Sequence, residues 1–406
     1  MFPEPQAGVS DLMKKRKAIY ASERCEDVIN MIRKDASLEY MAVIDKAGAP
    51  IGSIERHSLL ATVSHPLHYA VFQNKPITEL QTSSFIKVEA SASFDRLSSY
   101  LAEMGVSLNQ GGVIVVDDDK YVGVLDNADL LNQMMHLNAT RSKELSAAHE
   151  TVMDSVNYAS RIQQGLLPTV DRFRSLVKGV GLVWEPRDVV GGDIYWLSPV
   201  HESGCFWIAM IDCTGHGVPG AMVSMLVASA LDRIFETSPE LAPGNVLAKL
   251  GDLVRRALHQ DNEESYSNDG FDAALIRVAP QSGTIVYAGA RIGLFVVPRD
   301  DEPIQRINGS KSALGYKGVE PHQALPNTLL NIAEVKALVL ATDGVFDQPG
   351  GPYCRAFGPR RWMESIQSLR HCSPESMASA LRDEIDQWRG QETQRDDYSV
   401  LTIGFQ

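Results

Sequence analysis

Short apolar runs and helical segments follow one another over the second half of the chain. The runs are rich in β-branched and aromatic side chains and are bounded by Gly, Pro, Asn or Asp, which is typical of strands. They lie at 181–184, 205–211, 273–279, 284–287, 294–297, 335–341 and 398–405. Apolar residues with helical spacing fill 218–236, 243–260, 359–369 and 375–388. Because most strands follow one another directly, the pattern predicts antiparallel sheets flanked by helices.

The first 137 residues contain one order of elements twice. In each copy a helical stretch is followed by a strand, a polar turn, a second strand and a helix start. The two turns lie at 45–52 and 117–123. A unit that recurs in this way indicates an internal duplication.

This duplicated segment resembles a pair of CBS repeats, a small βαββα module. In that family the cleft between the repeats often binds adenine nucleotides. Asp129, near the start of the last helix, is the nearest match to the acid that binds the ribose, whereas Ser58 stands at the corresponding place of the first copy. The resemblance implies either a nucleotide sensor or a purely structural, dimerising module.

A long helix is expected between the two halves, because residues 128–167 contain no proline and only one glycine. Apolar and small residues recur there at alternating spacings of three and four: Leu145, Ala148, Val152, Ser155, Ala159, Ile162 and Leu166. This heptad seam favours a dimeric coiled coil, the alternative being an amphipathic helix that packs on its own domain. We therefore expect a sensor domain at 1–137, a helical linker at 138–168 and a second domain at 169–406.

Composition narrows the class of protein. A chain of 406 residues favours two domains, and its net charge of −13 argues against binding to nucleic acid or to an anionic membrane surface. The five cysteines are scattered and lack CxxC spacing, which is typical of free thiols in a reducing compartment. With no leader and no run of 18 or more apolar residues, we expect a cytoplasmic protein without a membrane span.

Four aspartates in the second half lie at strand ends or in turns: Asp193, Asp212, Asp343 and Asp396. Any one such acid beside a glycine is more often structural, as a helix cap or turn residue. Several acids at the ends of buried strands repel one another unless a cation lies between them. Oxygen-only ligand sets suit Mg²⁺ or Mn²⁺, so the set as a whole predicts a divalent metal centre.

Six motifs in fixed order extend this prediction: GGDIYW, DCTGHGVPGAMVSML, NDGFDAAL, YAGA, ATDGVFDQ and RDDYSVLTIGF. Together they resemble the PPM family of metal-dependent serine/threonine phosphatases, in its SpoIIE-like bacterial branch. The preceding segment VNYASRIQQGLLP resembles the sequence that leads into such domains. The resemblance implies an αββα sandwich with a two-metal centre at one edge. The expected fold class is therefore α+β, with this sandwich joined by a long helix to the CBS-type module.

The resemblance assigns metal ligation to the four aspartates named above, with Asp212 as the bridging ligand. It adds the backbone carbonyl of Cys213 to the ligands, and it assigns Asp269 to a weaker third metal. Asp397 is expected to support the ligands or the strand end without binding a metal itself, and Asp272 is not counted among the ligands.

The chemistry implied is hydrolysis of a phosphate ester. Two cations about 3.5–4 Å apart lower the pKa of a bridging water and clamp the oxygens of an in-line displacement at phosphorus. No thiol nucleophile is needed, and Cys213 lacks the phosphate cradle of cysteine phosphatases. His216 could protonate the leaving oxygen, or could instead pack or contact an anion at a helix start. Arg187 is a candidate for gripping the phosphate, its alternative being a solvated surface charge.

The expected function is a Mn²⁺- or Mg²⁺-dependent phosphoserine/phosphothreonine protein phosphatase that is regulated through the N-terminal sensor and the dimeric helix. In the resembling branch the substrates are often regulators of the anti-sigma-antagonist type, and this expectation rests on analogy alone. Two alternatives stay open. One is a non-catalytic, nucleotide-responsive scaffold with a degenerate phosphatase fold. The other is a phosphatase that acts on a small molecule.

Overall fold

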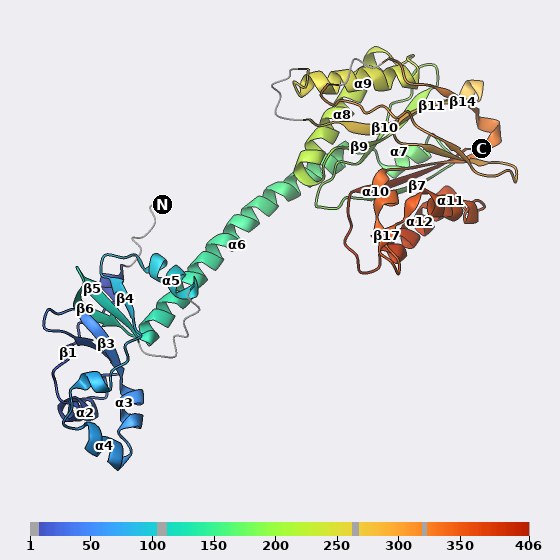
Figure 1. The fold of residues 1–406 in the computed structure, drawn as a ribbon. Helices are drawn as coiled ribbons and strands as arrows, with labels where there is room; N and C mark the ends of the chain where they lie inside the picture. The colour runs from blue at the N-terminus through green and yellow to red at the C-terminus, as the bar shows by residue number, and fades with distance from the viewer. Residues whose placement is uncertain (1–7, 104–111, 262–267, 319–322, 406) are drawn as a thin grey trace. The chain divides into compact units, whose positions relative to one another are not determined.

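A computed structural model of the chain describes residues 8–103, 112–261, 268–318 and 323–405 (Figure 1). The chain divides into two compact units, Met1–His149 and Glu150–Gln406. Each unit has hydrophobic core clusters of its own.

The N-terminal unit contains two three-stranded sheets of the same topology, with a parallel and then an antiparallel pair in each. The first sheet and its helices are β1 (Ile19–Tyr20), α2 (Cys25–Lys34), β2 (Tyr40–Ile44), β3 (Pro50–Glu55) and α3 (Arg56–Thr62). The second set is β4 (Ile86–Glu89), α5 (Phe94–Glu103), β5 (Val113–Asp117), β6 (Lys120–Leu125) and the start of α6 (Asn127–Leu166). Three short helices, α1 (Val9–Leu12), α4 (Pro66–Phe72) and η1 (Ile77–Glu79), lie outside this repeat. The order βαββα thus occurs twice, as the duplication in the sequence predicted.

Helix α2 shows why each copy folds in this way. Its apolar residues Cys25, Val28, Ile29 and Ile32 fall at helical spacing on one face, and all four are buried. They pack with Met41 and other strand residues into one core cluster.

Helix α6 is continuous over 40 residues, Asn127–Leu166. The large apolar side chains of its heptad seam, Leu145, Val152, Ile162 and Leu166, are all exposed in the single chain.

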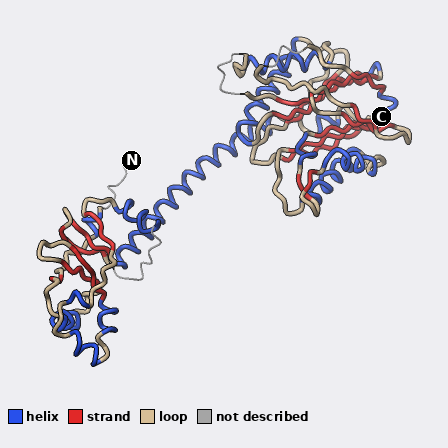
Figure 2. The backbone as a smooth tube through the Cα atoms, in the orientation of Figure 1, coloured by secondary structure: helices blue, strands red, loops and turns tan. Residues whose placement is uncertain are grey.

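The C-terminal unit is an αββα sandwich of two five-stranded antiparallel sheets (Figure 2). The first sheet has the order β14 (Thr328–Asn331), β11 (Thr284–Ala290), β10 (Phe271–Ala279), β9 (Phe206–Cys213) and β8 (Ile194–Leu197). The second has the order β13 (Gln305–Ile307), β12 (Leu294–Pro298), β15 (Val335–Ala341), β18 (Tyr398–Gly404) and β7 (Gly179–Glu185). This is the architecture that the sequence predicted.

Two helices cover the outer face of each sheet (Figure 1). Helices α8 (Gly217–Thr237) and α9 (Pro243–Ala257) lie on the first sheet, and α11 (Gly358–Ser368) and α12 (Pro374–Arg389) lie on the second. Shorter elements are α7 (Val170–Arg174), α10 (Asp343–Asp347), the turns η2 (Pro280–Ser282) and η3 (Ile332–Glu334), and the hairpin of β16 (Pro349–Gly350) and β17 (Arg355–Ala356). Helix α8 is long and apolar enough to cross a membrane by length and composition, but its buried residues belong to the core beneath it.

Alternation along the strands separates the two faces of the first sheet. On β9, Phe206, Ile208 and Met210 lie in the core between the sheets. Trp207, Ala209 and Ile211 of the same strand lie in the core beneath α8 and α9. The period of two in a strand therefore decides which residues at the strand ends face the space between the sheets.

Candidate active site

Three aspartates lie in one row across the end of the first sheet. Asp212 on β9 is paired with Asp272 on β10. Ile194 is paired with Ile211, which places Asp193 opposite Asp212. Residues paired across antiparallel strands point to the same face, and Asp212 has the same parity as the inward-facing Met210. The row therefore faces the space between the sheets.

The second sheet supplies two hydroxyl groups to this row. The Thr342 hydroxyl at the end of β15 donates to Oδ2 of Asp193 at 2.7 Å, and the Ser399 hydroxyl on β18 donates to the same oxygen at 2.8 Å. Asp193 is only 2% exposed. Its carboxylate is thus held between the two sheets by donors from the sheet to which it does not belong.

Burial and mutual repulsion raise the pKa values of these acids. Burial raises the pKa of Asp193 to about 8, even though the two hydroxyl groups oppose the shift. The pKa of Asp212 is raised well above its ordinary value by burial and then by the charges of Asp193 and Asp343. Burial raises the pKa of Asp343 as well. Strongly shifted acids gathered at one place are typical of a functional site.

The neighbouring Asp396 and Asp397 differ in their surroundings. Asp397 is buried, and its two oxygens accept hydrogen bonds from the backbone N–H groups of Arg187 and Gly192, both at 2.6 Å. It thereby ties the glycine loop before Asp193 to the start of β18. Asp396 is exposed, and its charge is among those that raise the pKa of Asp343, after burial.

Cys213 directs its side chain away from the acids, into the core beneath α8 and α9. Burial raises the pKa of this thiol well above its ordinary value, which keeps it uncharged. Its carbonyl oxygen instead faces Gly192, where a Cβ atom would lie 2.6 Å from it. Only glycine permits this approach, so the carbonyl of Cys213 lies beside the loop that carries Asp193.

His216 forms a hydrogen-bonded pair with Asp188. Its Nδ1 lies 2.7 Å from Oδ2 of Asp188, and both side chains are about half exposed. Because an ionised carboxylate only accepts hydrogen bonds, Nδ1 carries a proton and Nε2 is free of this contact. His216 is the residue before α8, and the turn that carries it uses positive φ at Gly215 (84°) and Gly217 (65°).

Three other sequence-predicted residues have contacts of their own. Asp269 precedes β10 and is held through its backbone, whose N–H and carbonyl pair with the side chain of Gln260. The exposed guanidinium of Arg187 donates to the backbone oxygen of Arg395 at 3.3 Å. Asp129 belongs to the N-terminal unit, where it forms an ion pair of 2.6 Å with Lys14.

Gln163, near the end of α6, is buried against the glycine loop, and no motif in the sequence marks this contact. Its Nε2 donates to the carbonyl of Gly191 at 2.6 Å and to the Ser224 hydroxyl at 3.1 Å. Its Oε1 accepts from the N–H of Gly191 at 3.3 Å. The Ser160 hydroxyl donates to the carbonyl of Val189 at 3.0 Å, so two α6 side chains bind this loop. A heptad seam marks only apolar positions, and for that reason it could not reveal these contacts.

The donor set fits a hard divalent cation. In the part of the chain that the structure describes, no group of three or more Asp, Glu, His or Cys side chains is placed so that it could hold a metal ion as it stands. The carboxylates instead bind hydroxyl groups and one another. Asp193 is buried, Asp212 is half-buried and Asp343 is exposed, and the charges of these three acids repel one another. A hard cation such as Mg²⁺ or Mn²⁺ relieves that repulsion.

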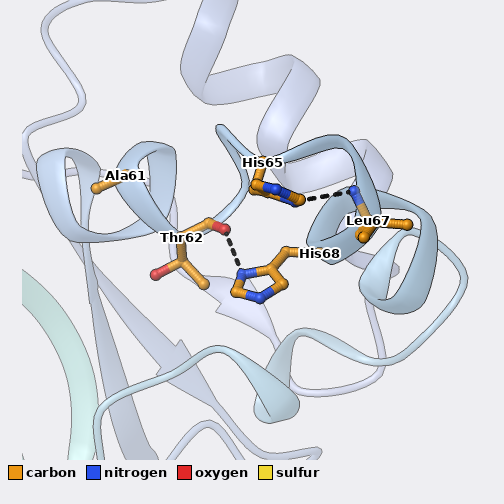
Figure 3. Close-up of a pocket in the computed structure, with 5 residues that line it drawn as sticks. All are labelled: Ala61, Thr62, His65, Leu67 and His68. Carbon is orange, nitrogen blue, oxygen red and sulfur yellow. Dashed lines mark hydrogen bonds between the residues drawn. The ribbon is translucent and has the colours of Figure 1, made fainter.

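An open hollow of about 480 Å³ lies in the N-terminal unit between α3 and α4 (Figure 3). Ala61, Thr62, His65, Leu67 and His68 line it. His65 accepts from the N–H of Leu67, and Nδ1 of His68 lies 3.1 Å from the carbonyl of Thr62. Both rings thus complete local backbone hydrogen bonding, and Asp129 is not part of this hollow.

Comparison with known proteins identifies the family to which the C-terminal unit is similar. The family of stage II sporulation protein E (SpoIIE) matches residues 202–406, a range that contains Asp212, Asp343 and Asp396. The solved SiaA-PP2C domain of Pseudomonas aeruginosa is 30% identical, covers 65% of this chain and 100% of its own, and has a TM-score of 0.56. No curated protein matches the chain.

Two further solved structures overlap less well. The PP2C phosphatase domain of SpoIIE from Bacillus subtilis, with a fragment of its regulatory domain, is 14% identical, covers 56% of this chain and 63% of its own, and has a TM-score of 0.44. A putative acetoin utilization protein (AcuB) from Vibrio cholerae is 16% identical, covers 34% of this chain and 98% of its own, and has a TM-score of 0.27. On the family match and the SiaA-PP2C likeness, the chain belongs to the SpoIIE family and carries a serine/threonine phosphatase domain of the PP2C type.

Proposed function

We propose that the chain is a Mn²⁺- or Mg²⁺-dependent phosphoserine/phosphothreonine protein phosphatase of bacterial signalling. The observation that carries the proposal is the gathering of Asp193, Asp212 and Asp343 from the two sheets, where burial and one another's charges raise their pKa values. Two cations would be held by these three acids, by Asp396 and by the carbonyl of Cys213. Asp269 would serve a weaker third site.

The residues of the chain have separable tasks in this reaction. When bound, the cations supply a nucleophilic water and neutralise charge at phosphorus. Thr342 and Ser399 fix the orientation of the Asp193 carboxylate. Asp188 holds His216 through Nδ1, which leaves Nε2 of the protonated ring to give a proton to the leaving serine or threonine oxygen.

Regulation is proposed to run from residues 1–137 through a linker at 138–168 to the phosphatase domain at 169–406. An adenine nucleotide bound at Asp129 in a CBS-type module would be the signal. Continuity of α6 supports this route, as do the bonds from Gln163 and Ser160 to the loop before Asp193. The substrate would be a phosphorylated cytoplasmic protein, such as a regulator of the anti-sigma-antagonist type.

A metal titration with a phosphatase assay tests the proposal. Full-length protein is incubated with a phosphoserine peptide, an aryl phosphate or a nucleotide, over a range of Mn²⁺, with and without adenine nucleotides. We expect Mn²⁺-dependent release of phosphate from the peptide. Adenine-nucleotide binding without metal uptake in calorimetry would favour the non-catalytic scaffold. Hydrolysis of small molecules alone would favour the small-molecule phosphatase.

Replacing Val152 by glutamate is expected to weaken a homodimer formed through the α6 seam. Val152 is 59% exposed in the single chain, and in a dimer the new charge would be buried against an apolar partner helix. Sedimentation of wild type and Val152→Glu over a range of concentrations measures the effect. The same gain of one negative charge at the exposed Asn157 of α6, Asn157→Glu, is the control, and identical dimers in all three proteins would contradict a seam at this position.

A further inference from the structure

Arg291 extends the row of acids across the first sheet. Strand β11 ends at Ala290, which is paired with Ala273, so Arg291 comes opposite Asp272. Asp272 is in turn paired with Asp212. Neighbouring strands are about 4.8 Å apart, which places the backbone of Arg291 roughly 10 Å from that of Asp212. An arginine side chain, together with the phosphate group that it would bind, can span that distance.

The backbone of Arg291 adopts a conformation that disfavours side chains. Its φ is +60°, in the left-handed region that glycine adopts freely and other residues rarely do. Two hydrogen bonds hold this turn, from the N–H of Arg291 to the carbonyl of Ser310 at 2.7 Å and from the N–H of Ile292 to that of Ala290 at 2.8 Å. Glycine would adopt this turn at a lower conformational energy. An arginine at this position therefore indicates that its side chain has a function.

The guanidinium of Arg291 has donors to spare. Its closest carboxylate oxygen is Oδ1 of Asp272 at 3.8 Å, which is longer than a hydrogen bond, and the side chain is 50% exposed. It makes no hydrogen bond with any residue in the described part of the chain. Its charge reaches the acids, since it opposes the rise that burial produces in the pKa of Asp272 and of Asp343. Arg291 is therefore a cation beside the acid row, and its guanidinium N–H groups are available to a ligand.

Arg187, the candidate named from the sequence, is engaged differently. Its guanidinium donates to the backbone oxygen of Arg395, and its backbone N–H, not its side chain, binds Asp397. Any residue with an N–H group could make the second contact.

We propose that Arg291 binds the phosphoryl group of the substrate, with its planar fork donating to two non-bridging oxygens of the phosphate dianion. The inference rests on the proposed phosphatase function and adds the side chain that recognises the phosphate. A guanidinium matches two phosphate oxygens at once, whereas lysine offers a single ammonium. Arg291 is a specificity residue in this role, since it orients the phosphate without entering the chemical step.

The experiment compares Arg291→Gln, Arg291→Lys and Arg291→Gly with Arg187→Gln, the competing candidate, and with Arg360→Gln at a 93% exposed arginine as the matched control. KM and kcat for a phosphoserine peptide are measured with saturating Mn²⁺. Inorganic phosphate is used as an inhibitor and, in calorimetry with Mn²⁺, as a ligand without turnover. We expect the glutamine and glycine variants of Arg291 to raise KM, the inhibition constant of phosphate and its dissociation constant about 10- to 100-fold. The lysine variant should lie between these two variants and the wild type. Arg187→Gln should change the same three constants by less than about threefold.

Arg291→Gly separates a binding role from a structural one. Glycine suits the positive φ, so this variant should melt at or above the temperature of the wild type while it loses phosphate affinity. A lower melting temperature with unchanged phosphate affinity would instead assign Arg291 a structural role and overturn the proposal.

The failures of the two proposals can be told apart. Turnover by the wild type with equal KM and phosphate constants in Arg291→Gln overturns the role of Arg291 and leaves the phosphatase intact. Phosphate binding that depends on Arg291 in a protein that hydrolyses no phosphopeptide supports this inference and removes the proposed function. Loss of phosphate affinity in Arg187→Gln alone returns the role to Arg187.

Discussion

Replacing Asp212 by asparagine is expected to abolish Mn²⁺-dependent phosphatase activity and, at the same time, to stabilise the metal-free protein. Asp212 lies between Asp193 and Asp272 in the row, and the charge of Asp343 also raises its pKa. It is thus the carboxylate nearest to all the others. Losing it removes a charge needed to hold cations, and with them several kcal/mol of transition-state stabilisation, or about 10³-fold in kcat.

The gain in stability has the same origin as the loss of activity. Without metal, folding must bury these acids together, and each unit by which burial raises a carboxyl pKa disfavours folding by about 1.4 kcal/mol near neutral pH. Asparagine keeps the shape of the side chain but carries no charge. We therefore expect a gain on the order of 1–3 kcal/mol, which is about 2–4 °C in melting temperature for each kcal/mol in a unit of this size.

The comparison needs melting curves with and without Mn²⁺, calorimetric Mn²⁺ titration and the phosphopeptide assay. Asp171→Asn is the matched control, because the side chain of Asp171 is 90% exposed and has no part in the proposed metal site, and this variant should keep the activity. Wild-type Mn²⁺ affinity in Asp212→Asn would contradict the metal centre. If the metal-free variant melts below the wild type, repulsion among these acids does not destabilise the metal-free protein.

Replacing Gln163 by leucine is expected to damage the phosphatase site from the helix that precedes it. Leucine is similar in size but cannot donate or accept, so it would leave the N–H and the carbonyl of Gly191 without their partner in a buried place. Each unpaired buried group disfavours folding by about 1–3 kcal/mol, which lowers the melting temperature by several degrees. Asp193 follows this loop directly. Because supporting contacts of this kind are worth about 10- to 100-fold in metal affinity, Mn²⁺ binding and activity should fall by similar factors.

Gln164→Leu is the control for Gln163→Leu. The next residue along α6 is exposed, and its amide contacts only the Ser160 hydroxyl, at 3.3 Å, among the described residues. This variant should behave as the wild type in melting, in Mn²⁺ titration and in turnover. Equal Mn²⁺ affinity in the two leucine variants would show that the contact of α6 with the glycine loop does not position Asp193.

The sequence was most informative where one local pattern decides the outcome. Long apolar runs such as 335–341 became strand β15 with the same bounds, because the run is buried on both faces and ends at a turn. Short or exposed strands were missed: β8 has only four residues, all buried, and lacks alternation, while β14 is a four-residue strand at the edge of its sheet.

The candidate site shows the limit of local patterns more sharply. The motifs indicated that Asp193, Asp212 and Asp343 act together, but they did not bring in Asp272 or Arg291. Both enter the row through the register of β9, β10 and β11, and register depends on pairing between segments far apart in the chain. The roles of Asp396 and Asp397 and the ligation by Cys213 remain predictions.

By itself the sequence determined the duplicated N-terminal module, the helix without proline, the antiparallel sandwich and the family to which the chain belongs, because each depends on spacing and order along the chain. Only the tertiary structure decided which side chains face one another: the hydroxyls of Thr342 and Ser399 on Asp193, Gln163 on the glycine loop, and Arg291 beside Asp272. These contacts join residues that lie between 19 and 206 positions apart. Packing of one sheet on the other, and not any local preference, brings such distant groups within hydrogen-bonding reach.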